Sequence, residues 1–202
     1  MALSTYAELK DSVANWADRH DLAPNIPDFI ALAEARLNRE LRLRAMESKE
    51  YTYTIGGQAN YALPGDYIQM REFRLNTTPT RSLQYITPEI YESWNFVGSG
   101  VPKFYTVIAN EVRLGRPPDG RYQMEMLFYK KFPKLSDTNP TNWVLENAPD
   151  ILLYGSLLEL EPFIQNDARI QVWSSGYQNA VDKLQLQDEK DRHSGSALMV
   201  RR

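Results

Sequence analysis

Residues 133–150 read PKLSDTNPTNWVLENAPD, and the interpretation of the fold depends on this stretch. It holds the densest cluster of polar residues in the chain, around a single tryptophan, Trp143. Strand patterns end just before it, near Phe132, and a strongly apolar helical pattern begins near Pro149. Such a cluster could be a catalytic site, but its position between two kinds of secondary structure favours a structural joint.

Turn chemistry within the stretch supports the joint. Asn139 followed by Pro140 is typical of a turn, and the short side chains of Asp137 and Asn142 suit bonding to nearby backbone groups. Trp143 is expected to anchor the loop against the helices. The predicted joint residues are Asp137, Asn139, Pro140, Asn142, Trp143 and Pro149.

The chain before this stretch, from about residue 50 to residue 132, is predicted to form a β region. Residues 51–63, YTYTIGGQANYAL, read as two runs about a Gly-Gly turn, which is a hairpin pattern. Residues 103–114, KFYTVIANEVRL, read as a second hairpin, and residues 122–130 alternate between apolar and polar side chains. Residues 87–96, beginning Thr-Pro, are expected to form a short helix between strands.

Helical patterns flank the β region on both sides. A capping box at residues 5–8 opens a first helix, and residues 26–41 carry one apolar face of a second. Pro149, with Asn147 as its predicted N-cap, opens a helix that is apolar nearly all round and should be buried. A longer amphipathic helix follows over about residues 167–192.

These patterns together predict an α+β fold. N-terminal helices and a long C-terminal helix should pack together, with a mostly antiparallel β region between them and an extended C-terminal tail. The expected domains are a discontinuous helical domain of residues 1–49 and 133–193, a β-rich domain of residues 50–132, and a C-terminal arm of residues 194–202. The arm lacks periodicity and is expected to be mobile.

Composition argues against several classes of function. The 202-residue chain has 23 Lys and Arg against 26 Asp and Glu, so it lacks the basic excess with which dedicated DNA-binding proteins displace counterions. Without cysteine it can form neither disulfides nor thiolate sites. No apolar run approaches the length of a membrane span, and the first residues do not match a secretion signal.

No residue pattern predicts catalysis, a metal or a cofactor. The two histidines, His20 and His193, have no partner at metal-ligand spacing. VGSGV at residues 97–101 lacks the spacing of a nucleophile elbow. Glu159 and Glu161 are two residues apart, so on a helix they point to different faces and do not form a carboxylate pair. We therefore expect a protein that is not an enzyme.

Two surfaces leave other roles open. The 12 tyrosines and 4 tryptophans could line a sugar-binding surface, although core packing explains most of them first. Arg36, Arg39, Arg42 and Arg44 lie along the second helix and just beyond it. They could contact a nucleic-acid backbone or pair with acidic residues of a neighbouring copy, and we treat them as candidate subunit-interface residues.

Four stretches resemble the head-to-tail adaptor, or connector, proteins of tailed bacteriophages. They are residues 133–163, residues 61–75 (YALPGDYIQMREFRL), residues 101–120 (VPKFYTVIANEVRLGRPPDG) and the ending SGSALMVRR. Their order and spacing are similar to that family along nearly the whole chain.

The resemblance implies a structural virion protein of the head-to-tail junction, assembled in the bacterial cytoplasm. It implies a ring, typically of twelve copies, that binds the portal, extends the DNA channel without sequence-specific DNA binding, and gives the next tail or nozzle protein a docking platform. In relatives a helical part and a C-terminal arm grip the portal, while the β part faces the tail. The corresponding arm residues here are Leu198, Met199, Val200, Arg201 and Arg202. A carbohydrate-binding tail or spike module, or a carboxylate glycosidase, remains the alternative.

Overall fold

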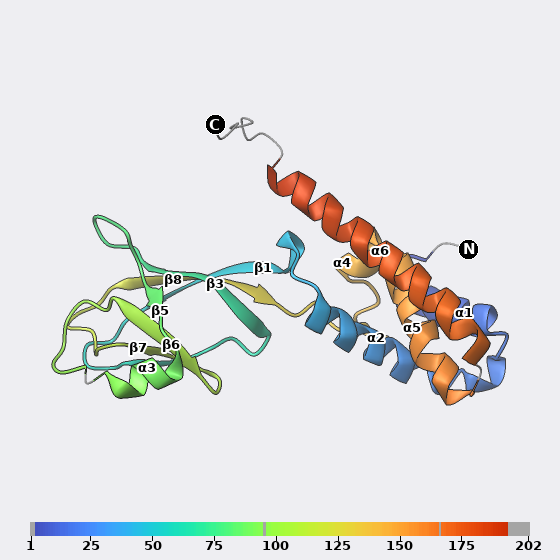
Figure 1. Cartoon of the computed structure of the whole chain (residues 1–202), viewed down its shortest axis with the longest axis horizontal. Coiled ribbons are helices and arrows are strands. Elements are labelled where there is room, and N and C mark those ends of the chain that lie inside the picture. Colours follow the sequence, from blue (N-terminus) through green and yellow to red (C-terminus); the bar gives the residue numbers. More distant parts are fainter. Residues whose placement is uncertain (1–2, 95, 166, 194–202) are drawn as a thin grey trace. The chain divides into compact units, whose positions relative to one another are not determined.

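The computed structural model describes residues 3–94, 96–165 and 167–193, and Figure 1 shows it as a ribbon. Contacts divide the chain into two compact units. The helical unit comprises residues 1–45 and 132–202, and the β unit comprises residues 46–131. The chain therefore leaves the helical unit once, builds the β unit and returns. Whether these units are independent domains, with the boundaries expected at 49/50 and 132/133, stays a prediction.

The helical unit consists of helices joined by short connections. Its elements are α1 (Tyr6–Ala17), a 3-10 turn (His20–Leu22), α2 (Ile26–Glu40), α4 (Trp143–Asn147), α5 (Pro149–Phe163) and α6 (Asp167–His193). A second 3-10 turn, Arg44–Met46, lies where the chain passes into the β unit. The predicted capping box of α1 is confirmed: the Thr5 hydroxyl accepts from the Glu8 backbone N–H, and the Glu8 carboxylate accepts from the Thr5 N–H.

Helix α5 is the centre of the helical unit and contacts α1, α2, α4 and α6. Its fully buried apolar residues are Ile151, Leu152, Leu157 and Leu160. This burial confirms the prediction from a sequence that is apolar nearly all round. At Gly155, α2 comes so close that an added Cβ atom would lie 3.1 Å from the Cβ atom of Ala33.

The β unit is built from two four-stranded sheets. Its elements are β1 (Glu47–Tyr53), β2 (Asn60–Ala62), β3 (Tyr67–Leu75), β4 (Arg81–Ser82), β5 (Gln84–Tyr85), α3 (Pro88–Ser93), β6 (Phe104–Ile108), β7 (Glu111–Leu114) and β8 (Gln123–Lys130). The first sheet has the order β1-β8-β3-β4 and is antiparallel throughout. The second has the order β2-β7-β6-β5, with β5 and β6 parallel.

One cluster of buried side chains from both sheets forms the core of the β unit. Its members are Leu63, Phe73, Leu75, Leu83, Tyr105, Val112, Leu114, Met124, Met126 and Phe128. The last three come from β8 and form the apolar row that alternation predicted. The second predicted hairpin, β6 with β7, is also confirmed, and Ala109 in its turn has a φ of 56°. Together the helices and sheets confirm the α+β class.

The hairpin predicted for residues 51–63 is wrong. Strand β1 pairs with β8 and β2 pairs with β7, so the Gly56-Gly57 turn crosses from one sheet to the other. The turn is fixed instead to the loop before β8, since Gly57 N–H donates to the carbonyl of Pro118 at 2.9 Å. All seven residues of β1 pair with β8, which lies inside its sheet with β3 as its other neighbour.

Candidate assembly interface

Residues 133–148, here the junction segment, connect the end of the β unit to α5 within the helical unit. The segment is tied to α1 at two points. The backbone N–H of Tyr6 donates to the carbonyl of Pro140 at 2.7 Å. Lys10 forms an ion pair of 2.9 Å with Asp137, whose side chain is 86 % exposed. The predicted joint residues Pro140 and Asp137 therefore hold the start of α1.

A closed turn lies in the middle of the junction segment. Backbone hydrogen bonds run both ways between Ser136 and Asn139, at 3.0 and 3.1 Å. The Asn139 side chain also donates to the carbonyl of Lys134 at 2.7 Å. This geometry fits a turn-forming Asn before proline and leaves the loop polar groups bonded to one another.

A buried pair of polar side chains, Glu34 of α2 and Asn142, holds the segment against the helices. Glu34 is 8 % exposed, and its Oε1 accepts from the N–H of Leu135 at 2.9 Å and from Asn142 Nδ2 at 3.2 Å. Asn142 Oδ1 accepts from the N–H of Leu145 at 2.9 Å and so caps α4. Burial raises the pKa of the Glu34 carboxyl above its usual range.

The sequence analysis missed Glu34. A glutamate on the apolar face of α2, one turn from Ile30 and one from Leu37, was the available signal. A charged residue on a buried helix face needs a partner, and here both partners come from the junction segment.

The joint residue Trp143 and the predicted cap residue Asn147 lie at the start and the end of α4. Trp143 is half-buried and stacks on Phe132, with ring centroids 5.8 Å apart and ring planes 5° from parallel. Asn147 was predicted to cap α5, and that prediction is wrong. Asn147 is the last residue of α4 and its side chain donates back to the Trp143 carbonyl at 2.8 Å. Helix α5 begins directly at Pro149, with no side-chain cap.

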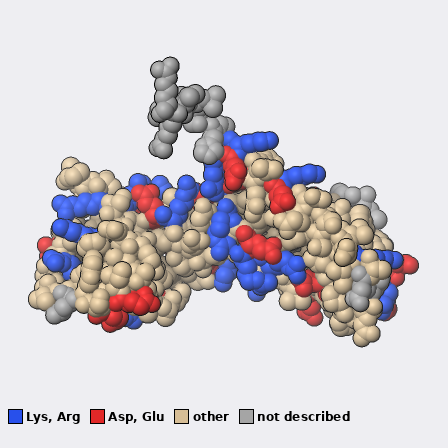
Figure 2. Space-filling model, in the orientation of Figure 1, with Lys and Arg blue, Asp and Glu red and all other residues tan. Residues whose placement is uncertain are grey.

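Three of the four candidate interface arginines have contacts within the chain. Arg36 pairs with Glu159 of α5. Arg44 pairs with two acids of α6, Asp188 at 3.2 Å and Asp191 at 3.0 Å. Figure 2 shows such basic and acidic side chains next to one another on the face it draws.

Arg42 donates to the carbonyl of Asn38 at 3.0 Å, which lies one turn earlier in α2. Arg39 is exposed, and no ion pair is recorded for it within residues 3–94, 96–165 and 167–193. Whether these arginines contact a neighbouring copy stays a prediction. Their internal contacts are consistent with a role in fixing α2 against α5 and α6.

The two predicted glutamates of α5 do point to different faces. Glu159 meets Arg36, whereas Glu161 is fully buried and accepts from the indole N–H of Trp173 at 2.8 Å. They cannot serve one hydrolytic site, as the sequence spacing indicated.

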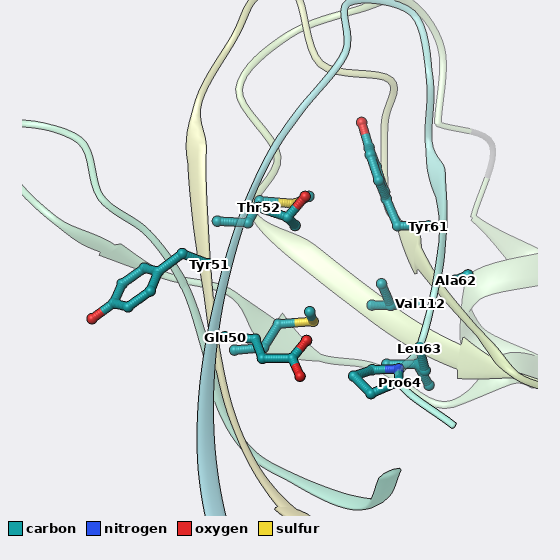
Figure 3. A pocket seen from close by; sticks show the side chains of 10 residues that line it. Glu50, Tyr51, Thr52, Tyr61, Ala62, Leu63, Pro64 and Val112 are labelled. Carbon is teal, nitrogen blue, oxygen red and sulfur yellow. The ribbon is translucent and has the colours of Figure 1, made fainter. Parts of the chain in front are cut away.

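Two grooves indent the β unit. One, of about 440 Å³, lies between β1 and β2 and is drawn in Figure 3. The other, of about 770 Å³, is lined in part by Tyr67, Tyr85 and Tyr105. Burial raises the pKa of Tyr105 to about 12, so its hydroxyl stays protonated at neutral pH.

Within the ranges that the structure describes, no group of three or more His, Cys, Asp or Glu side chains is placed to hold a metal ion. None of the helices described there is long and apolar enough to cross a membrane. The predicted portal-binding residues, Leu198, Met199, Val200, Arg201 and Arg202, lie outside the described residues.

Comparison with known proteins gives one family. A family model described as SU10 adaptor protein matches residues 4–201, and so spans both units. No curated protein matches the chain. The family match confirms the resemblance to phage head-to-tail adaptors on which the sequence analysis rested.

Proposed function

The chain belongs to the SU10 adaptor protein family, which makes it a phage adaptor and a structural virion component, and on this premise we propose that it assembles as a ring on the portal. In this proposal the ring has about twelve copies, continues the DNA channel and presents the docking platform for the next tail protein. The family match over residues 4–201 is the observation that carries the proposal.

A ring needs two side surfaces on each copy that are complementary but not identical, because only a heterologous contact can close into a ring. A rigid helical unit suits that task. The Glu34–Asn142 pair and the ties from Pro140 and Asp137 fix the junction segment to α1 and α2. These bonds make the junction segment part of the helical unit rather than a loose linker.

A DNA channel should not hold the DNA that passes through it. Binding to phosphates grows with the number of counterions that Lys and Arg displace. The net charge of −3 is consistent with a channel that lets DNA slide without sequence-specific contact.

The test is assembly with the cognate portal. We expect the full-length chain, mixed with purified portal rings, to co-sediment with them and to appear as an added ring by electron microscopy. A chain that stays monomeric and unbound at every salt concentration tried would refute the proposal.

The groove lined by Tyr67, Tyr85 and Tyr105 supports a second candidate, a carbohydrate-binding tail module. The ring of Tyr85 is 50 % exposed and could stack on a sugar. A glycan-array signal that Tyr85→Ala removes, without a change in melting temperature, would favour this candidate. Absence of any glycan signal would leave the adaptor as the better assignment.

A further inference from the structure

Strand β1 has a free edge. In the first sheet it hydrogen-bonds to β8 on one side only. The Thr54 N–H donates to the carbonyl of Tyr122 at 2.8 Å, so Thr54 faces β8. Hydrogen-bonded residues alternate along an antiparallel strand, so the backbone groups of Lys49, Tyr51 and Tyr53 point to the open side. Such an edge is ready to pair with another extended chain.

The groove between β1 and β2 opens beside this free edge. Met124, Met126 and Val112 line it, with Leu63 at the β2 side. Figure 3 shows the Glu50 side chain lying in the gap between the two strands, while Tyr51 points away from it. Strand β2 is likewise the edge of its own sheet, so no strand of the β unit closes this side.

Glu50 is an unusual residue for that position. It lies opposite Met126 in the register and so on the sheet face that carries the core. Among the ten residues that line the groove it is the one with a charge. Within the described ranges no ion pair or hydrogen bond is recorded for its carboxylate. Glu50 is exposed, so its carboxylate is accessible to a cation from outside the chain.

The opposite edge of the same sheet offers that cation. The order β1-β8-β3-β4 puts β4 at the far edge from β1. Arg81 of β4 is exposed, and no ion pair is recorded for it in the same ranges. It lies opposite Leu75, which lies opposite Met124, so Arg81 and Glu50 share the core-facing side of the sheet.

The backbone of β4 is also suited to pairing. The Leu83 N–H donates to the carbonyl of Phe73 at 2.8 Å, so Leu83 faces β3 and Ser82 faces the free edge. In Figure 1 the loop that precedes β4 stands out beyond the end of β3. The part that can pair is β4 itself, Arg81–Ser82, because the chain bends just before it, at residues 78–79.

We propose that β4 (Arg81–Ser82) of a second copy adds to the free edge of β1, with Arg81 of that copy paired to Glu50. The sheet would then continue from one copy to the next, and the shared face would bring the two charges to the same side. The contact joins two different edges of one sheet, so it is heterologous and can repeat around a ring. It names the self-contact of the ring in the proposed function and rests on that function.

Charge exchange tests the pairing in the full-length chain. Glu50→Arg alone and Arg81→Glu alone each juxtapose like charges, and each should weaken self-association by about tenfold or more. The double variant restores opposite charges, and it should return self-association to within about threefold of the natural chain. Sedimentation of the chain alone and on portal rings measures both.

Matched controls change the same charges elsewhere on the β unit. Glu92→Arg on α3 and Arg116→Glu after β7 alter exposed residues that lie in neither edge strand, and both should associate as the natural chain does. Melting curves show which variants fold. If Glu50→Arg does not fold, Glu50→Gln takes its place and should still weaken association.

Two results would overturn the inference: folded single variants that associate like the natural chain, or a double variant no better than the singles. Glu50 would then be an inward charge that protects an edge from pairing. Such a result leaves the adaptor proposal intact if the natural chain still forms a ring on the portal. Failure of the natural chain to bind the portal refutes the adaptor function separately.

Discussion

At the residue scale, Trp143 combines ring stacking with partial burial. Its ring lies parallel to Phe132 and its side chain is half-buried. For a fully buried tryptophan, truncation to alanine would lower the free energy of unfolding by about 3 to 5 kcal/mol. Because part of its surface stays in water, we expect Trp143→Ala to lower the free energy of unfolding, measured by urea titration, by about 2 kcal/mol.

Trp143→Phe is the matched control, because it keeps a ring against Phe132. We expect Trp143→Phe to lower the free energy of unfolding by less than about 1 kcal/mol in the same urea titration. Equal losses for the two substitutions would show that the stack contributes little, and an unchanged stability for Trp143→Ala would point to a binding role for the ring.

Glu125 of β8 gives the β unit a pH dependence of known sign. It hydrogen-bonds to Arg74 at 2.5 Å, and contacts with Lys49 and Asn76 add to this, so its pKa falls to about 2 from an ordinary 4.5. A carboxyl with a lowered pKa stabilises the fold above its unfolded pKa. That stabilisation should be lost as the pH falls from about 4.5 towards 2.

Comparison with Glu125→Gln isolates this contribution, since other carboxyls titrate in the same range. At neutral pH the natural chain should be the more stable of the two. The difference in unfolding free energy should shrink as the pH approaches 2. A difference that stays constant from neutral to acidic pH would contradict the assigned pKa.

At the scale of elements, the contact of α2 with α5 depends on Gly155. Alanine favours a helix over glycine by about 1 kcal/mol, which alone would make Gly155→Ala stabilising. Its Cβ atom would lie 3.1 Å from the Cβ of Ala33, which is fixed to the α2 backbone and cannot turn away. We expect the crowding to outweigh the propensity and to leave a net loss of about 1 kcal/mol.

An Ala33→Gly background removes the crowding, so the expected effect of Gly155→Ala on stability changes from a loss to a gain. There, Gly155→Ala should stabilise the chain by up to about 1 kcal/mol, as measured by chemical denaturation. Gly155→Ala having the same effect in both backgrounds would mean that the two helices do not meet at these residues.

The elements divide into those that a local pattern determines and those that it does not. Helix α5, the apolar row of β8 and the β6–β7 hairpin follow from periodicity and turn residues, so the sequence predicted them. The Gly56-Gly57 turn was recognised, but its strands were paired wrongly. A turn signal says that the chain reverses, whereas the partner of each strand here lies far along the chain, β8 for β1 and β7 for β2.

The candidate site shows the same division. Asn142 could be chosen from sequence, because a short polar side chain at a helix start has a local role. Sequence alone could not pair Glu34 with the junction segment, since Leu135, which donates to its carboxylate, lies 101 residues later in the chain. The cap of α5 was predicted wrongly because α4 ends at Asn147, directly before the next helix begins.

At the scale of the whole molecule, the chain crosses between its units twice, at residues 45–46 and 131–132. The return crossing leads straight into the junction segment, and just before it the Phe132 N–H donates to Asn38 Oδ1 at 3.0 Å. The crossing is therefore bonded to α2 at its first residue. The family match spans this crossing and both units, so adaptor function belongs to the whole chain.

The C-terminal arm, residues 194–202, is the simplest part of the adaptor proposal to test by deletion. Residues 194–202 hold the apolar triplet Leu198, Met199 and Val200 beside two arginines. Nine residues with three large apolar side chains can contribute little to a core. We expect deletion of residues 194–202 to leave the melting temperature of the isolated chain unchanged and to weaken portal binding strongly.

The loss should be large because the arms act together. About twelve weak contacts on one ring hold far more tightly than one, and deleting every arm removes all of them at once. Replacing Leu198, Met199 and Val200 with serine, while keeping both arginines, is the matched variant. If the triplet fills a groove of the portal and the arginines pair at its rim, this variant should lose most of the binding that the deletion loses. A truncated chain that co-sediments with portal rings like the natural chain would assign portal binding to the helices instead.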